Sequence, residues 1–531
     1  MKKVFKKSCL LLSLLFALTT VLSACSKNSD TNTSSEPTTT ATSATTAPAA
    51  AADPNAIDTS KEVKLTMYLV GDPYPDAPAV YDEINNMLKR DINATVDVKF
   101  TSWETDKKIP LLLASGENFD CIYTASWAQY VPSATKNGFL EITEDMLKKY
   151  MPDYYKDIPQ GFIDNTKING KSYMIPYAMA QVYNYSTAII RSDLREKYNI
   201  PELKTLDDLD NYMLTVAAKE KGIIPYDGNM SAFYWDFPSL YYAQPQNMYL
   251  GLERSLELFS VNLADTSGKV NYILDDPKYL DFLNRMKKLS DGGAWSKNIM
   301  SSQNTNEKSI KAGKSVVDIH HLGSMQSRTL DIQGIDGAKS EVYDFSPDSL
   351  KAATPGTQSG MAIHATSKNV ERTMMMLNLF ATKKEYYDLL EGGIEGKHYE
   401  LVGDKVKELP GADKAYPFDS VCPWGWQNAK LQRTVDGVPT IDKDWTEKWK
   451  SEEKVYTGPY IAFNFDDSNV KNEMAVCMNI VQTRGYALTT GMLADPKAEL
   501  EKYKAELKKA GIEKIQAELQ QQLTDYINSS K

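Results

Sequence analysis

A strand–helix–strand alternation at the start of the folded region constrains the fold of this chain more than any other feature. Apolar residues alternate with mostly polar ones in a first strand, at Val63, Leu65, Met67 and Leu69. A helical face follows at Val80, Ile84, Met87 and Leu88, then a strand at Val96, Val98 and Phe100, a helix at Ile109, Leu112 and Leu113, and a strand at Cys121, Ile122 and Tyr123. Strands in this order pair in parallel through right-handed crossovers. The pattern predicts an α/β fold.

The ends of these three strands are the first place to look for a ligand site. Open parallel sheets bind ligands beyond the carboxyl ends of their strands. The residues that follow the three strands include Asp72, Trp103 and Trp127. We therefore predict that these three side chains contact a ligand. The alternative for either tryptophan is that it only packs in the core.

Further elements follow with changes of direction. We expect a hairpin turn at Asn169-Gly170, strands at 189–191, 316–319 and 361–363, helices at 205–217, 277–289 and 374–380, and terminal helices over 496–527 with a break at Gly511. Asp207 and Asp208 after Thr205 resemble a capping box at a helix start. No internal repeat is evident.

The N-terminus has the pattern of a targeting signal. Lysines at positions 2, 3, 6 and 7 precede an apolar stretch from Cys9 to Leu22, which is short for a membrane span. The segment ends in Leu22-Ser23-Ala24-Cys25, which resembles a bacterial lipobox. This predicts a lipoprotein signal peptide at 1–24 and a lipid on the thiol of Cys25. An uncleaved signal anchor is the alternative.

A polar spacer follows the signal. Residues 26–56 contain no Ile, Leu, Val or aromatic residue, and consist mainly of Ser, Thr, Ala, Asn and Pro. Such a composition buries too little apolar surface to offset the entropy of ordering. We predict a flexible tether over 25–59. The alternative is a weakly ordered extension that packs on the folded body.

Charge and motif content exclude several classes of function. The formal net charge of −10 argues against a protein that binds phosphate backbones. The chain has 4 His and 5 Cys, which argues against zinc ribbons and disulfide frameworks. We find no nucleophile elbow, no zinc-protease motif and no calcium loop, so we predict no metal, no cofactor and no catalytic set. A glycosidase carboxylate pair can be neither chosen nor excluded among 70 acidic residues.

Aromatic usage favours a ligand that is part apolar and part polar. Tyr occurs 31 times and Phe only 15 times. Tyrosine and tryptophan offer a flat apolar face and a polar edge, which suits a sugar ring. Trp424 and Trp426 flank Gly425 in an expected loop, so we predict ligand contact for both. Trp235 lies in an aromatic cluster that more often indicates core or interface packing.

Several motifs together resemble one family. They are the lipobox, the Ser/Thr-rich tether, the acidic α/β body, the terminal helices and the stretches 175–193, 393–399 and 463–466. The chain resembles the long branch of extracellular solute-binding lipoproteins that serve carbohydrate ABC importers in Gram-positive bacteria. Some long members carry a calcium loop, and this sequence has no evident one.

The resemblance implies a periplasmic-binding-protein-like α/β fold with two hinge-joined lobes and a helical C-terminal extension. We expect residues 60–180 with about 300–360 in the first lobe, and 181–299 with 361–531 in the second. A ligand is expected in the cleft between the lobes.

The predicted function is reversible capture of an oligosaccharide or related sugar, without chemistry, and delivery to an ABC permease. Trp103 and Trp127 are expected to stack from the first lobe, and Asp72 and His320 to bond hydroxyl groups. The second lobe or its edge is expected to add Trp235, Trp295, Trp424 and Trp426, and Tyr183 lies near a hinge. We expect a monomer, lipid-anchored on the extracellular face of the cell membrane. The alternatives are a lipid-anchored glycoside hydrolase or lyase, and a peptide-binding or sensor lipoprotein.

Overall fold

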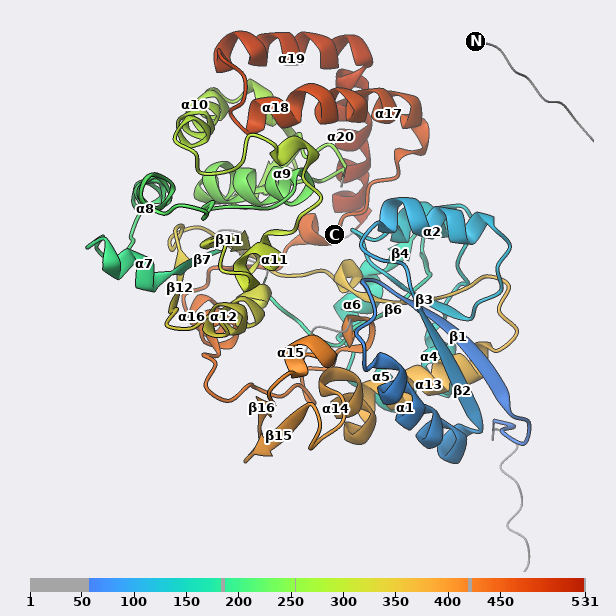
Figure 1. Ribbon diagram of the computed structural model, residues 1–531. Coiled ribbons are helices and arrows are strands. Elements are labelled where there is room, and N and C mark those ends of the chain that lie inside the picture. The colour runs from blue at the N-terminus through green and yellow to red at the C-terminus, as the bar shows by residue number, and fades with distance from the viewer. Residues whose placement is uncertain (1–56, 183–186, 254, 419–422, 530–531) are drawn as a thin grey trace, which may run out of the picture. The chain divides into compact units, whose positions relative to one another are not determined.

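The computed structural model describes residues 57–182, 187–253, 255–418 and 423–529 (Figure 1). Contacts along the chain divide it into two units, Met1–Ala56 and Ile57–Lys531. All of the described residues belong to the second unit. The predicted signal peptide, the lipidation site Cys25 and nearly all of the tether lie outside the described residues, as does Tyr183.

A five-stranded sheet forms around the N-terminal strands, in the order β2-β1-β3-β14-β6. β1 (Val63–Leu69) pairs in parallel with β2 (Ala94–Phe100) and with β3 (Cys121–Thr124). The connections are helices α1 (Ala77–Ile92) and α2 (Thr105–Ala114). The β-α-β-α-β order read from the sequence is therefore confirmed.

Distant segments complete this sheet. β14 (Gly360–Ile363) pairs antiparallel with β3 and with β6 (Ile175–Pro176). Residues 65–179 share one hydrophobic core with residues 361–426. The other elements in this part are α3 (Tyr130–Thr135), α4 (Glu144–Tyr150), α5 (Pro152–Tyr155), α6 (Gln160–Asn165), the hairpin β4 (Lys167–Ile168)–β5 (Lys171–Ser172), α13 (Val370–Thr382) and α14 (Lys384–Gly392). We call this part the first lobe.

A buried guanidinium joins the distant segments of the first lobe. Arg372 of α13 is almost fully buried. It donates hydrogen bonds to the backbone carbonyls of Ile92 and Asn93, where α1 ends, and to the carbonyl of Asp58. Cations are favourable at the carboxyl end of a helix because the carbonyls there lack partners within the helix.

A second core lies over two other sheets. β7 (Thr187–Arg191) pairs antiparallel with β11 (Val317–His320) and β12 (Ser340–Asp344) on its two sides. The other sheet comprises β8 (Met248–Leu250), β9 (Phe259–Asn262) and β10 (Asn271–Tyr272). The helices of this part of the molecule are α7 (Ser192–Lys197), α8 (Leu206–Lys219), α9 (Met230–Pro238), α10 (Pro277–Asp291), α11 (Asn306–Lys311), α12 (Met325–Gln333), α16 (Ile441–Ser451), α17 (Lys471–Ile480) and α18 (Tyr486–Thr489). We call this part the second lobe.

The C-terminal helices belong to the second lobe. Their buried residues, which include Leu500, Leu507, Ile515, Leu519 and Leu523, share a core with α8, α9 and α10. α19 (Pro496–Ala510) ends at Gly511, which has a φ of 94°, and α20 (Ile512–Ser529) follows. Both terminal helices and the break between them were predicted. The capping box at Thr205 is also confirmed, since its hydroxyl and the Asp208 carboxylate bond each other's backbone N–H groups.

The sheet pairings reverse the predicted assignment of the two returning segments. β11 and β12, within residues 300–360, pair with β7 of the second lobe. β14 and α13, which follow residue 360, belong to the first-lobe core. The sequence of a short apolar strand indicates that the strand is buried. It does not indicate which sheet the strand joins, because that depends on pairing with strands hundreds of residues away.

Described residues that connect the two lobes include 180–182 and 352–360. An isolated β-bridge joins Val182 to Ala353, and the N–H of Thr354 donates to the carbonyl of Gln181 at 2.9 Å. β13 (Lys351–Ala352) also pairs with β17 (Val455–Tyr456). Two crossing segments therefore run side by side, as expected for hinge segments.

A smaller element lies beside the first lobe. β15 (Tyr399–Val402) and β16 (Lys405–Glu408) form an antiparallel hairpin, followed by α15 (Ala412–Ala415).

None of the helices within the described ranges is both long and apolar enough to cross a bilayer.

We expect the substitution Leu519→Ala in α20 to lower the free energy of unfolding by about 2–5 kcal/mol, because it leaves a cavity in the second-lobe core. Gln521→Ala, two residues later on the exposed side of the same helix, is the control and should change this free energy by less than about 0.5 kcal/mol. Urea denaturation measures both. Equal effects of the two substitutions would show that α20 is not part of the core.

Candidate functional site

Aromatic side chains from three separate segments meet at the ends of the first-lobe strands. The rings of Trp103 and Trp424 have centroids 5.7 Å apart, and Tyr123 lies 5.6 Å from Trp127 and 6.3 Å from Trp424. Trp103 is 58% exposed and Trp127 is 39% exposed, whereas Tyr123 is buried beneath them. We call these four residues the aromatic shelf.

Two glycines allow the shelf to form. Gly71, at the end of β1, has a φ of 95°, and a Cβ at this position would lie 3.7 Å from the Trp103 ring. Its backbone also pairs with that of Ser102, which places Trp103 beside β1. A Cβ at Gly425 would lie 2.3 Å from the sulfur of Met361. Glycine at 425 therefore lets the Trp424 segment approach β14 closely.

Polar groups with unused hydrogen-bonding capacity lie beside Trp127. Its ring N–H donates to the carbonyl of Gln358 at 3.0 Å, and the N–H of Ser126 donates to the carbonyl of Thr357 at 2.7 Å. The hydroxyls of Ser126 and Thr357 are buried and have no hydrogen-bond partner among the described residues. Buried polar groups are usually paired, so these two hydroxyls are available to water or to a ligand.

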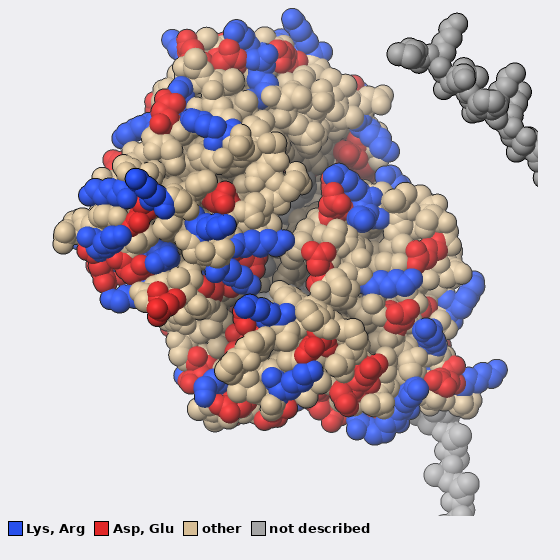
Figure 2. All heavy atoms as spheres, in the orientation of Figure 1, with Lys and Arg blue, Asp and Glu red and all other residues tan. Residues whose placement is uncertain are grey.

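The shelf lies near the second lobe. Asp106 is in the first turn of α2, three residues after Trp103. Burial raises the pKa of the Tyr486 hydroxyl on α18, and the charges of Glu257 and Asp106 raise it further, so Asp106 acts across the two lobes. Tyr486 packs on Tyr234 of α9 with ring centroids 4.6 Å apart. Figure 2 shows the surface hollowed between the part formed by α9 and the part formed by α2.

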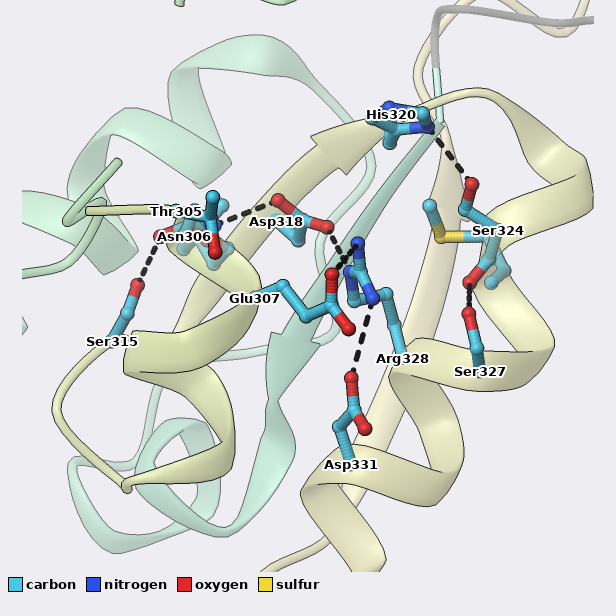
Figure 3. A network of polar contacts seen from close by, with 12 residues as sticks. Thr305, Asn306, Glu307, Ser315, Asp318, His320, Ser324, Ser327, Arg328 and Asp331 are labelled. Carbon is cyan, nitrogen blue, oxygen red and sulfur yellow. Dashed lines mark hydrogen bonds and ion pairs between the residues drawn. The ribbon is translucent and has the colours of Figure 1, made fainter. Parts of the chain in front are cut away.

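A network of charged side chains connects α11, α12 and β11 in the second lobe (Figure 3). Arg328 of α12 donates to Asp318 of β11 at 2.6 Å and to Asp331 at 3.2 Å, and lies 3.4 Å from Glu307 of α11. Asp318 also accepts from the amide of Asn306 at 2.7 Å. Burial lowers the pKa of Arg328, but the three carboxylates raise it more, so its net direction is upward.

His320 ends β11 at the edge of this network. Its Nδ1 lies 3.0 Å from the Ser324 hydroxyl, which also lies 3.1 Å from Nε2 of His321. Burial lowers the pKa of His320 to about 4, and the nearby Asp318 only partly opposes that effect. A neutral imidazole can both donate and accept a hydrogen bond.

The structure brings some of the predicted ligand residues together and separates others. Trp103, Trp127 and Trp424 share the shelf, although Trp424 was expected on the second lobe. Asp72 is exposed, directly after Gly71, and Trp235 is partly buried on α9. His320 lies on the second lobe, whereas it was expected in a segment of the first.

Two predicted ligand residues are instead core residues. Trp295 is buried among Phe233 and Phe237, and its ring N–H donates to the carbonyl of Thr490 at 3.1 Å. Trp426 is buried against Phe380 in the first-lobe core. A tryptophan in a sequence indicates a large apolar face but not which environment that face meets, so these two predictions are corrected.

Sequence reasoning assigned no ligand contact to Tyr123, Thr357 or Gln358, and it placed Ser126 at a strand end without giving it a role. Tyr123 and Ser126 lie within four residues of Trp127, at the end of the same predicted strand, so their position alone could have suggested them. Thr357 and Gln358 come from a segment more than two hundred residues away, and no local pattern connects them with β3.

The described residues include no group of three or more His, Cys, Asp or Glu side chains that could hold a metal ion.

Cys121 and Cys477 are free and buried. Burial raises the pKa of the Cys121 thiol well above its ordinary value, as is typical of an unreactive buried cysteine.

Comparison with known proteins shows what this chain is similar to in sequence. Residues 459–528 match a family described as a domain of unknown function, DUF3502. A carbohydrate ABC transporter substrate-binding protein of Streptococcus pneumoniae is 24% identical over 485 residues, which cover 90% of this chain and 93% of that protein.

Solved structures of solute-binding proteins share the fold. The N-glycan transport solute binding protein NgtS of S. pneumoniae, in complex with Man1GlcNAc, aligns with a TM-score of 0.72 at 21% identity and covers 88% of this chain and 100% of its own. The alginate-binding protein AlgQ2 aligns with a TM-score of 0.62 at 15% identity, over 87% and 98% of the two chains. The predicted two-lobe α/β fold is thus confirmed.

We expect the stability of the wild type, relative to a His320→Gln variant, to fall as the pH is lowered. The pKa of His320 is depressed from its ordinary 6.5 to about 4, so the unfolded chain binds the proton first as the pH falls. The free energy of unfolding should lose up to about 3 kcal/mol between pH 6.5 and 4, relative to the variant. Urea denaturation at several pH values measures the difference. A difference that stays constant over this range contradicts the expectation.

Proposed function

We propose that this chain is the solute-binding subunit of an ABC importer and captures an oligosaccharide between its two lobes. The observation that carries the proposal is the aromatic shelf, in which Trp103 and Trp424 come from segments more than three hundred residues apart and leave indole surface exposed to solvent. Large aromatic side chains are usually buried, and their exposure at the end of a sheet is typical of ligand sites.

The chemistry of the shelf suits a sugar. The C–H faces of a pyranose ring stack on indole, and its hydroxyls bond to polar groups at the edge. The hydroxyls of Ser126 and Thr357 and the carboxylate of Asp72 supply such groups on the first lobe. On the second lobe, neutral His320 and partly buried Trp235 supply a donor, an acceptor and a further ring. Tyr183 is proposed as an additional contact near the hinge.

The related proteins support the same ligand class. The relative of S. pneumoniae is named as a carbohydrate transporter subunit, and the structure of NgtS contains a mannose–N-acetylglucosamine ligand. Both relatives align over most of their length with this chain. We propose a glycan of comparable kind for this protein, delivered to permease subunits in the membrane.

The N-terminal segment supports attachment at the outer face of the cell membrane. The lipobox ending at Cys25 provides a thiol for a lipid, and the Ser/Thr/Ala-rich residues 25–59 provide a spacer. A tether of this composition keeps the folded body close to the permease without fixing its orientation. We propose that the folded body acts as a monomer.

We expect Trp103→Ala and Trp424→Ala each to weaken oligosaccharide binding about 5- to 30-fold, because each removes a stacking surface worth about 1–2 kcal/mol. Isothermal titration with a panel that includes mannose- and N-acetylglucosamine-containing glycans measures the affinities. Trp445→Ala on α16, which lies outside the shelf, is the matched control and should bind like the wild type. Unchanged affinity in both shelf variants removes the shelf from the binding site.

Binding without chemistry has its own test. We expect the bound oligosaccharide to be recovered intact, and the protein to melt at a higher temperature in its presence, because a ligand that binds only the folded state stabilises it. Thermal denaturation and a reducing-end assay on the same samples measure both. Release of reducing ends in proportion to protein would favour the alternative of a glycoside hydrolase or lyase.

A further inference from the structure

A segment near the C-terminus is anchored in the second lobe and also contacts the first. It covers residues 459–466, at the start of the region 459–528 that matches DUF3502. Phe463 and Phe465 are buried in the second-lobe core, and Asn464 between them is only half-buried. The backbone on both sides of Asn464 is therefore held by side chains that cannot move without exposing apolar surface.

Polar contacts fix both ends of this segment to the second lobe. The hydroxyl of Tyr460 accepts from the N–H of Gly268 at 3.0 Å. The N–H of Asp466 donates to the side-chain oxygen of Gln522 on α20 at 2.9 Å, and the amide nitrogen of Gln522 donates to the carbonyl of Asp466 at 2.8 Å. Because both ends are bonded and the two phenylalanines are buried, the segment moves with the second lobe.

Asn464 reaches the first lobe from this anchored position. Its side-chain amide donates to the backbone carbonyl of Asn165 at 3.3 Å and to the carbonyl of Ala462 at 3.2 Å. Asn165 is the last residue of α6, which packs in the first-lobe core through Phe162 and Ile163. The last carbonyls of a helix have no partner within the helix. The amide of Asn464 therefore bonds a group of the first lobe that requires a donor from elsewhere.

The same end of α6 also holds one of the segments that connect the lobes. The N–H of Gly356 donates to the side-chain oxygen of Asn165 at 3.3 Å. A Cβ at position 356 would lie 2.3 Å from the carbonyl oxygen of Phe162, so glycine lets this segment lie directly on α6. Asn165 thus accepts from the connecting segment with its side chain and from Asn464 with its backbone.

We infer that residues 459–466 form a strap that limits the movement of the two lobes relative to each other, and that Asn464 is its positioning residue. The strap bonds the second lobe to the end of α6, beside the connecting segment at Gly356. A hydrogen bond between two bodies favours those arrangements in which it is made. This gives a role to the first residues of the region that matches DUF3502. The role in lobe movement does not depend on which ligand binds.

The experiment compares Asn464→Asp with Asn469→Asp in the compact unit Ile57–Lys531, which contains both hydrophobic cores. Aspartate has nearly the shape of asparagine, but its carboxylate cannot donate to the carbonyl of Asn165. Asn469 is the matched control, because its amide donates to Glu518 of the same lobe at 2.9 Å. Both substitutions replace an amide donor by a carboxylate, but only Asn464→Asp removes a bond between the lobes.

Double electron–electron resonance between two spin labels measures the distances between the lobes without ligand. The labels are attached to Lys108→Cys on α2 and Asn479→Cys on α17, two exposed positions. Every variant also carries Cys422→Ser, and the other two cysteines of this unit are buried. We expect a broader distance distribution for Asn464→Asp than for the wild type, an unchanged one for Asn469→Asp, and an intermediate one for Asn464→Ser, which keeps a donor.

Asn464→Ala is a second variant, which removes the donor without adding a charge and should also broaden the distribution. It decides the question if Asn464→Asp does not fold. Circular dichroism and melting temperature establish folding in each case. Equal widths for the wild type and the folded Asn464 variants overturn the inference. An equal broadening in Asn469→Asp overturns it as well, because the effect would then not require a bond between the lobes.

Titration with the glycan that binds the wild type separates this inference from the proposed function, on which any link to affinity rests. A protein with more lobe arrangements has a smaller share in the one that binds, so we expect Asn464→Asp to bind about 2- to 5-fold more weakly. Asn469→Asp should bind like the wild type. If no saccharide binds the wild type, the proposed function fails while the distance measurement still decides the role of the strap. If the wild type binds and the Asn464 variants match it in both distance distribution and affinity, the inference fails and the proposed function stands.

Discussion

The pairing of buried strands with partners from distant parts of the chain is the interaction on which the rest of the structure depends. All five residues of β7 are buried, so their backbone groups must find partners away from water. β11 and β12 provide those partners from residues 317–344. In the first lobe, β14 does the same for β3. Because each lobe is completed by a segment that has passed through the other region, neither lobe is continuous in sequence.

This connectivity also produces the candidate site. Trp103 follows a strand of the N-terminal unit, and Trp424 follows the segment that returns after β14. The two rings meet only because β14 lies beside β3 and Gly425 lets the chain pass close to Met361. The shelf is therefore a consequence of the crossing topology, and the same crossings provide the two hinge segments at Val182 and Ala353.

The two faces of the proposed site differ in chemistry. The first lobe offers indole surface with a few unpaired hydroxyls, and the second offers a charged network whose members are nearly all paired with one another. A paired network is rigid and does not itself demand a ligand, since its carboxylates already accept from Arg328 and Lys311. The exposed indole surface therefore lies on the first lobe, and the mutually paired charges lie on the second.

Local patterns in the sequence determined several elements. The period of two in Val63–Leu69 predicts β1, because one side of a strand faces the core. Thr205 and Asp208 predict the start of α8, and Gly511 predicts the break between the terminal helices. Each of these depends on contacts within a few residues, which a sequence displays directly.

Only the tertiary structure decided which strands pair and which tryptophans reach solvent. Trp103 and Trp295 are chemically identical, yet one is mostly exposed and the other is buried with its ring N–H bonded. The assignment of residues 317–344 and of residues 361–426 to their lobes was likewise reversed, whereas the C-terminal helices lie in the second lobe as predicted. The physical reason is that burial and strand pairing depend on residues hundreds of positions away, whereas periodicity, capping and turn formation depend on the immediate neighbours of each residue.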